Sequence, residues 1–78
     1  MDIDNAIVLL ADVIADSERK NRSQGIEFYK SAIRMLQNKN LSDSELKDLQ
    51  RNFCGYLAHG DFSNAEYQKI LKLIELLE

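Results

Sequence analysis

Residues 41–46, Leu-Ser-Asp-Ser-Glu-Leu, are the stretch of sequence that decides the fold, and residues 62–67, Phe-Ser-Asn-Ala-Glu-Tyr, repeat their pattern. In each stretch a serine lies three residues before a glutamate, which is the capping box that begins an α-helix. A hydrophobic residue on either side of each box forms the pair that is known as a hydrophobic staple. The two motifs therefore predict helices that begin at residues 43 and 64.

Apolar residues recur at helical spacing on both sides of these motifs. The spacing predicts helices over residues 4–19, 24–39, 43–59 and 64–78. The absence of Pro also favours helices, and Gly60 is placed to end the third one in the left-handed conformation. Because short connections make successive helices antiparallel, we predict one all-α domain over residues 1–78, a compact four-helix up-and-down bundle whose second half is a helical hairpin. An irregular orthogonal packing is the alternative.

One face of each predicted helix carries the expected core. These residues are Ile3, Ile7, Leu10 and Ile14; Ile26, Tyr29, Ile33 and Leu36; Leu46, Leu49, Phe53, Tyr56 and Leu57; and Tyr67, Ile70, Ile74 and Leu77. Leu71 and Leu73 are expected on the flanks of the last helix, and Leu76 is expected to be exposed. Cys54 is expected to be buried as a small hydrophobic residue at the edge of the core.

The first helix has more apolar surface than one core face needs. Only a narrow strip that holds Asn5, Asp12 and Asp16 is polar. Two interpretations remain open: the helix is central and touched on several sides, or it presents Val8 and Leu9 to a partner or to a second copy. Phe28 and Met35 pose the same question in the second helix, where they either widen the core face or form an apolar contact for a partner.

Composition and charge limit the classes of function. The net charge is −3, divided as −4 over residues 1–16, +4 over residues 17–40 and −3 over residues 41–78. An acidic chain repels nucleic acid over most of its surface, so protein partners are favoured. A single Cys forms no internal disulfide, the first residues are acidic and no apolar run is long enough to span a membrane, so we expect a cytoplasmic protein without membrane contact.

The residues that catalysis or metal binding would need are too few. His59 is the only histidine, and it is expected in solvent, where it would stabilise the end of the third helix. One His and one Cys do not supply a metal site, and no phosphate-binding or nucleophile motif occurs. We therefore expect no enzyme activity, no catalytic residue, no metal and no cofactor. A basic cluster around the start of the second helix leaves a nucleic-acid-binding regulator as a third, less favoured function; it comprises Arg19, Lys20, Arg22, Lys30 and Arg34.

The chain resembles two known kinds of protein. Residues 25–36, Gly-Ile-Glu-Phe-Tyr-Lys-Ser-Ala-Ile-Arg-Met-Leu, resemble the second helix of tetratricopeptide and microtubule-interacting-and-transport modules, which bind peptides or helices. The short acidic format and residues 62–67 resemble small cytoplasmic immunity proteins of toxin and bacteriocin systems, several of which are helical bundles. Neither resemblance assigns a role to a particular residue.

The sequence thus predicts a small protein-binding module of inhibitor or immunity type that neutralises or regulates one protein partner. The expected contact residues are Val8, Leu9, Asp12, Asp16, Phe28 and Met35, and the acidic strip among them suits a partner with a basic surface. The alternative function is a homo-oligomeric adaptor or regulatory domain, in which Leu9 and Leu76 contact a second copy.

Overall fold

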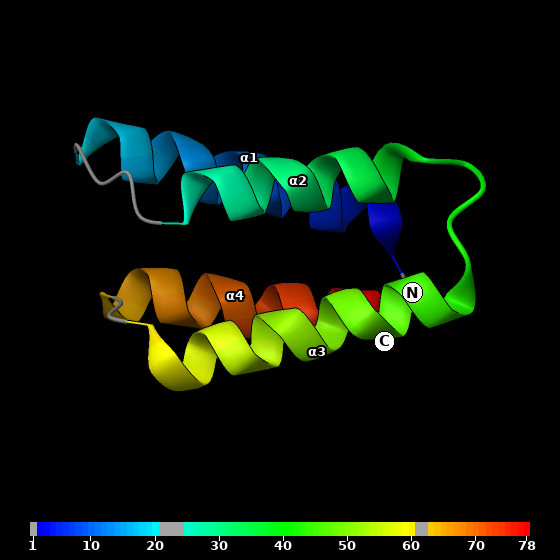
Figure 1. Ribbon diagram of the computed structural model, residues 1–78. Coiled ribbons are helices and arrows are strands. Elements are labelled where there is room, and N and C mark those ends of the chain that lie inside the picture. The colour runs from blue at the N-terminus through cyan, green and yellow to red at the C-terminus, as the bar shows by residue number, and fades with distance from the viewer. Residues whose placement is uncertain (1, 21–24, 61–62) are drawn as a thin grey trace.

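The computed structural model of the chain is a four-helix bundle (Figure 1) and describes residues 2–20, 25–60 and 63–78, the side chain of His59 excepted. Within these residues the helices are α1 (Ile3–Arg19), α2 (Ile26–Gln37), α3 (Asp43–His59) and α4 (Asn64–Leu77). The predicted all-α fold is confirmed, and each predicted helix is present with bounds that differ by two residues or fewer.

The helices form two layers, α1 with α2 and α3 with α4 (Figure 1). Helix α1 packs against α2 and α4, and α4 packs against α3. The remaining side is joined by aromatic rings, since Phe28 of α2 lies 4.8 Å from Phe53 and 5.2 Å from Tyr56 of α3. Helix α1 therefore packs against two other helices, which uses part of its apolar surface, and Val8 is left exposed.

Both capping serines act as predicted. The backbone N–H of Glu45 donates to Ser42 Oγ at 3.1 Å, and that of Glu66 donates to Ser63 Oγ at 3.2 Å. The first staple has Leu46 in the core and Leu41 packed against it. Phe62 of the second staple lies outside the described residues. Helix α1 is capped in the same manner by Asp2, which accepts from the backbone N–H of Asn5.

Helix α2 is two residues shorter than predicted at each end, and it begins at Ile26 instead of residue 24 because Gly25 is its N-cap. Gly25 has a φ of 82°, a left-handed conformation in which a residue without Cβ is favoured. At the other end, the backbone N–H of Asn40 donates to the side chain of Asn38, which is in an extended conformation. This local bond competes with helix continuation, so α2 ends at Gln37 instead of Lys39.

Gly60 corrects a second expectation about a helix end. Its φ of −83° and ψ of 158° are extended, not left-handed. Its N–H still donates to the carbonyl of Tyr56 at 2.8 Å, so the last turn of α3 closes without a positive φ. Any residue adopts this backbone conformation, and Gly60 is not required there for conformational reasons.

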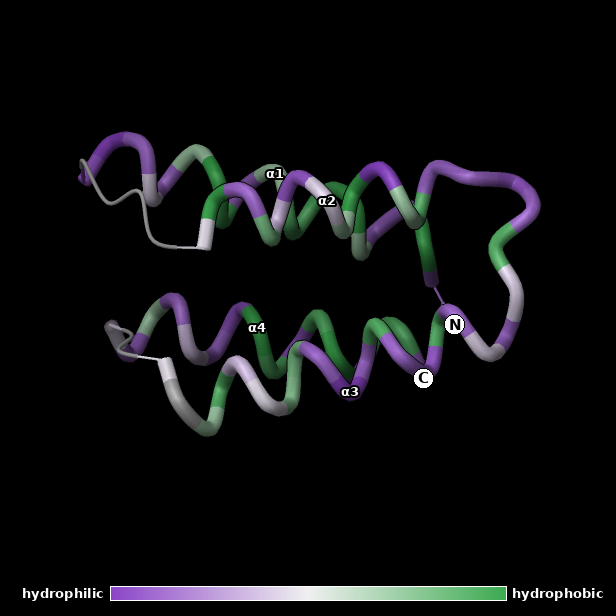
Figure 2. Tube along the Cα trace, in the orientation of Figure 1, coloured by the Kyte–Doolittle hydropathy of each residue, from purple (hydrophilic) through white to green (hydrophobic). Residues whose placement is uncertain are grey.

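The core lies between the two layers, and hydrophobic residues occur along all four helices (Figure 2). Its centre includes small residues that the hydrophobic pattern did not assign to the core: Ala6, Ser17 and Ala32 are each at most 2% exposed. Ile3, Ile7 and Ile33, which the pattern assigned to the core, are only half-buried. Small side chains let neighbouring helices approach closely, so they occupy the lines of contact while the isoleucines lie beside them.

Four expectations about burial are wrong. In α4 the buried stripe is Glu66, Ile70, Leu73 and Leu77. Tyr67 is therefore 39% exposed and Leu73 is buried, because the helix turns the Glu66 side toward the core. Cys54 is exposed, since α3 directs Phe53 inward and the next residue points outward. Leu76 is half-buried against the core instead of exposed.

Candidate binding groove

A groove between α1 and α4 brings together three of the predicted contact residues. It has a volume of about 420 Å³ and is lined by Asn5, Val8, Leu9, Asp12, Lys72 and Leu76. Val8 is 66% exposed, whereas Leu9 and Leu76 are half-buried and form an apolar floor that also packs against the core. The groove therefore combines one exposed apolar side chain with polar groups on both walls.

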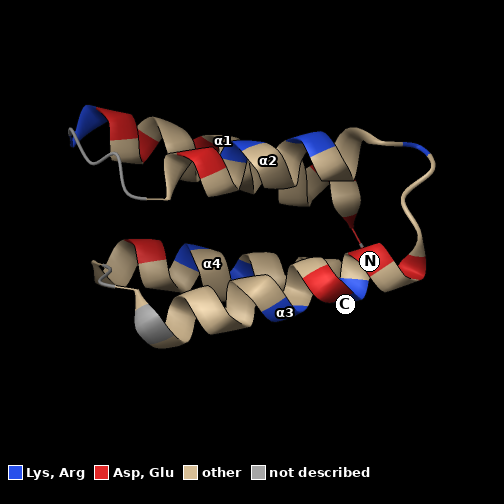
Figure 3. Cartoon of the chain, viewed as in Figure 1, with Lys and Arg blue, Asp and Glu red and all other residues tan. Residues whose placement is uncertain are grey.

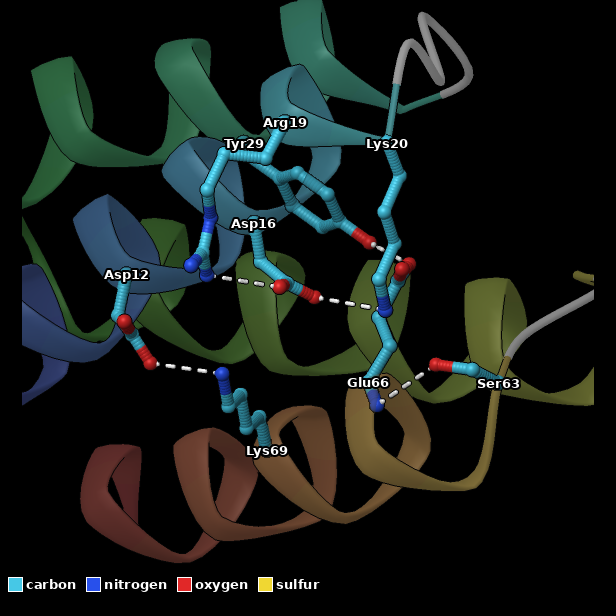
Figure 4. Close-up of polar contacts among 8 residues, drawn as sticks. All are labelled: Asp12, Asp16, Arg19, Lys20, Tyr29, Ser63, Glu66 and Lys69. Carbon is cyan, nitrogen blue, oxygen red and sulfur yellow. Dashed lines mark hydrogen bonds and ion pairs between the residues drawn. The ribbon is translucent and has the colours of Figure 1, made fainter.

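The acidic strip of α1 is held by ion pairs within the chain. Asp12 Oδ2 lies 2.8 Å from Lys69 Nζ, which links α1 to α4 (Figure 4). Asp16 pairs with two bases that follow it in the chain, Arg19 at 2.9 Å and Lys20 at 3.1 Å. The hydrogen bond from Lys20 and the nearby charges of Lys20, Lys69 and Arg19 lower the pKa of the Asp16 carboxyl.

Asp16 does not line the groove, and it lies one helical turn beyond Asp12 in α1. Its carboxylate is therefore an extension of the acidic wall and not part of the groove itself. Asp12 keeps about half of its side-chain surface exposed in spite of its ion pair with Lys69, so it stays accessible to a further cation.

Phe28 and Met35 lie on α2, not with the other predicted contact residues. Phe28 is half-buried in an aromatic cluster with Tyr29, Phe53 and Tyr56. Met35 is half-buried and packs against the core. Both residues thus contribute to a wide core face, which was the simpler of the two interpretations of their spacing.

A buried polar contact joins α2 to α4 at the end of the bundle opposite the chain termini. The Tyr29 hydroxyl donates to Glu66 Oε2 at 2.9 Å, with both residues buried (Figure 4). Burial, followed by hydrogen bonds with Tyr56 and Glu66, raises the pKa of the Tyr29 phenol. Glu66 thus both begins α4, through its backbone N–H, and holds α4 to α2, through its side chain.

Sequence patterns gave no role in binding to Lys69 and Lys72, and they gave Glu66 only a capping role. An available signal was the spacing of Glu66, Ile70, Leu73 and Leu77, which share one helical face. The position of Lys69 and Lys72 could have been inferred from the antiparallel pairing of the first and last helices. This pairing places them along the wall that faces Asn5 and Asp12.

The basic cluster of the sequence is not one continuous charge in the described residues. Arg19 and Lys20 pair with Asp16, and Arg22 lies outside the described residues. Lys30 and Arg34 are exposed on α2. Two of the five predicted bases therefore share one ion-pair partner, Asp16, of the same chain.

Metal-binding clusters and membrane-spanning helices are both absent from the described part of the chain. Residues 2–20, 25–60 and 63–78 contain no group of three His, Cys, Asp or Glu side chains placed to hold a metal ion. In the same residues no helix has both the length and the apolar character that crossing a membrane requires. Comparisons of the chain with protein-family models, with curated proteins and with solved structures found no match.

Proposed function

We propose that this chain is a small non-catalytic protein-binding domain of inhibitor or immunity type, and that it binds the basic surface of one protein partner through the α1–α4 groove. The observation that carries the proposal is the exposure of Val8, a β-branched side chain with 66% of its surface in solvent beside the half-buried Leu9 and Leu76. Exposed apolar side chains with a polar rim are typical of protein contact surfaces.

Charge supports a basic partner. Helix α1 carries four acids, Asp4, Asp12, Asp16 and Glu18, and one base, Arg19, at its end. A second copy that presented its own α1 to this helix would bring like charges together, whereas a basic surface would be attracted. The charge of α1 therefore favours a different, basic protein over a contact between the α1 helices of two copies.

We also propose that the protein is located in the cytoplasm. Cys54 is an exposed free thiol, and a reducing compartment keeps such a thiol from forming intermolecular disulfides. A nucleic-acid-binding function has less support, because Asp16 pairs with two of the bases that would contact phosphate.

The test uses tagged chain to capture a stoichiometric partner from native lysate, followed by titration calorimetry of the two purified proteins. Val8→Lys should reduce affinity by about tenfold or more, because it places a hydrated charge in the apolar contact. Charge reversal at Asp12 and Asp16 should reduce both the affinity and its dependence on salt. Lys30→Glu, on the exposed side of α2, is the matched control and should bind as the wild type does.

Circular dichroism and thermal unfolding of each variant separate loss of binding from loss of folding. Failure of the wild-type chain to capture any stoichiometric partner would contradict the proposal. So would a captured partner that binds folded Val8→Lys with unchanged affinity.

A further inference from the structure

The outer face of the α3–α4 hairpin is a second surface, separate from the groove. Residues at positions i, i+4, i+7 and i+11 along each helix share this face, and we call them the hairpin face: Lys47, Arg51, Cys54 and Ala58 on α3, with Tyr67, Leu71 and Ile74 on α4 and Glu78 directly after it. All of them are exposed except the half-buried Ile74. Among the described residues, the large hydrophobic residues that are exposed are Val8 and two members of this face, with Tyr67 39% and Leu71 37% exposed.

The two stripes of the hairpin face run in opposite directions and lie at matching heights. Lys47 and Glu78 are neighbours, because both line a small hollow of about 180 Å³ at one end of the hairpin. Because the two helices are antiparallel, the next members of the stripes also lie at equal heights along the hairpin. Arg51 is level with Ile74, Cys54 with Leu71, and Ala58 with Tyr67. The last pair is next to the connection that joins α3 to α4.

The stripes differ in both size and charge. The stripe on α3 begins with two bases and ends with two small residues, and residues 52–58 carry no charge, as the uncharged part of α3 in Figure 3 shows. On α4 the members level with those small residues are large, Tyr67 and Leu71, and the member level with Lys47 is acidic, Glu78. Three of the four levels are thus complementary in size or charge, and at the fourth Arg51 lies level with Ile74.

We infer that the hairpin face binds a second copy of this chain, with α3 of one protomer over α4 of its partner about a twofold axis parallel to the helices. This arrangement places Lys47 opposite Glu78 twice, once on each side of the axis. It also seats the large side chains Leu71 and Tyr67 over the small Cys54 and Ala58. Like small-to-large packing elsewhere in proteins, this leaves few voids at the contact.

The opposite approach, α3 over α3, fits less well. A twofold axis perpendicular to the helices would place Lys47 over Ala58 and Tyr67 over Glu78. No opposite charges would then meet, and two small residues of α3 would face the bases of the partner. Charge and size together therefore select the α3-over-α4 arrangement.

The area of the face sets the expected strength. Eleven residues of helix rise about 17 Å, and two packed helices are about 20 Å wide, so each partner buries on the order of 350 Å². The total lies below the ~1,200–2,000 Å² of stable complexes. The dimer should therefore be weak, and it leaves the α1–α4 groove of both protomers open.

Sedimentation equilibrium of the wild-type chain from about 10 µM to about 1 mM tests this inference. The expected result is a monomer at the low concentrations and a dimer at the high ones. Leu71→Lys should stay folded and monomeric throughout, because it places a charge at the centre of the face. Val8→Lys, the matched exposed change in the groove, should dimerise as the wild type does. The two variants therefore test the dimer and the proposed partner site independently of each other.

A mixing experiment tests the arrangement. Lys47→Glu alone and Glu78→Lys alone should each weaken dimerisation by about tenfold, because each places like charges opposite one another twice. An equimolar mixture of the two variants should regain wild-type affinity as a heterodimer, since both pairs are then opposite in charge. Contacts within one chain cannot be restored by mixing. A wild-type chain that is monomeric at about 1 mM, or a mixture that regains no affinity, would overturn the inference.

Discussion

The two ends of the bundle are closed in different ways. At the end where α1 and α4 meet the chain termini, the contacts are exposed: Ser42 Oγ donates to Glu45 Oε1 at 3.1 Å, and the backbone N–H of Asp2 donates to the carbonyl of Leu76 at 2.7 Å. At the other end, Tyr29, Tyr56, Glu66 and the backbone of Gly25 form a tight, largely buried group. The same capping motif begins a helix at each end, yet only Glu66 enters the core.

This difference shows that a local motif fixes where a helix starts but not what its side chains do next. Glu45 has solvent around it and turns back to its own serine. Glu66 faces a buried phenol, and an unpaired phenol in the core would cost more than a missing capping bond at the surface. Among the described residues, no buried side-chain polar atom lacks a hydrogen-bond partner. Changes at the buried end should therefore cost more than matched changes at the exposed end.

Gly25→Ala should have the largest effect. A Cβ at this position would collide with the Tyr56 phenol, and the φ of 82° disfavours any residue with a side chain. Left-handed strain of about 1 kcal/mol and overpacking of about 1–3 kcal/mol should lower the free energy of unfolding by about 3 kcal/mol. Urea denaturation measures the loss, and a loss below about 1 kcal/mol would mean that Tyr56 moves aside freely.

Glu66→Ala compared with Glu45→Ala measures the difference between the two ends directly. Removing the Glu66 carboxylate takes an acceptor from the buried Tyr29 hydroxyl and should cost about 2 kcal/mol. The same change at the exposed Glu45 should cost about 0.5 kcal/mol.

The control for Glu66 is a double-mutant cycle with Tyr29→Phe. Because the two side chains are hydrogen-bonded, their losses should be non-additive by about 1 kcal/mol. Equal losses at positions 45 and 66, or full additivity in the cycle, would contradict the assigned contact.

Alkaline pH should weaken the buried end next. The pKa of Tyr29 is raised in the folded chain, so above about pH 10 the unfolded chain has released this proton while the folded chain retains it. The stability that this phenol contributes is thus present below about pH 10 and falls by about 1.4 kcal/mol per pH unit above it. Tyr29→Phe lacks this group, so its stability should fall less steeply when both proteins are unfolded by urea from about pH 9 to about pH 11. Parallel slopes would contradict the raised pKa.

Gly55→Ala should have the smallest effect and the opposite sign. Gly55 lies within α3, and a Cβ there would meet no atom within 4 Å. Because alanine loses less backbone freedom than glycine in a helix, the substitution should raise the free energy of unfolding by about 0.5–1 kcal/mol. Thermal unfolding checks the change, and a lower melting temperature would show that another group covers this position.

Most of the fold was predictable because helix starts depend on neighbouring residues. The serines at 42 and 63 predicted the first residues of α3 and α4 correctly. Burial depends instead on how each helix is rotated about its axis, which is decided by contacts with distant residues. The contact between Tyr29 and Glu66 joins residues 37 positions apart, and it accounts for the wrong assignment of Tyr67 to the core.

The candidate groove was predictable only on one side. Val8, Leu9 and Asp12 share one flank of a single helix, so their spacing was enough to group them. Lys72 and Leu76 come from another helix, and their position depends on which helices are neighbours in the bundle. The ion pair of Asp12 with Lys69 has the same dependence, since neither residue identifies its partner by spacing.

The hydrogen bond between the backbone N–H of Asp2 and the carbonyl of Leu76 joins the first and last parts of the described chain. It brings the two ends of the described chain to the same end of the bundle, next to each other (Figure 1). The connection from α2 to α3 is at that end too and runs through exposed residues 38–40. A circular permutant joined across residues 78 and 1 and cut in this connection should therefore keep the same pairs of helices in contact.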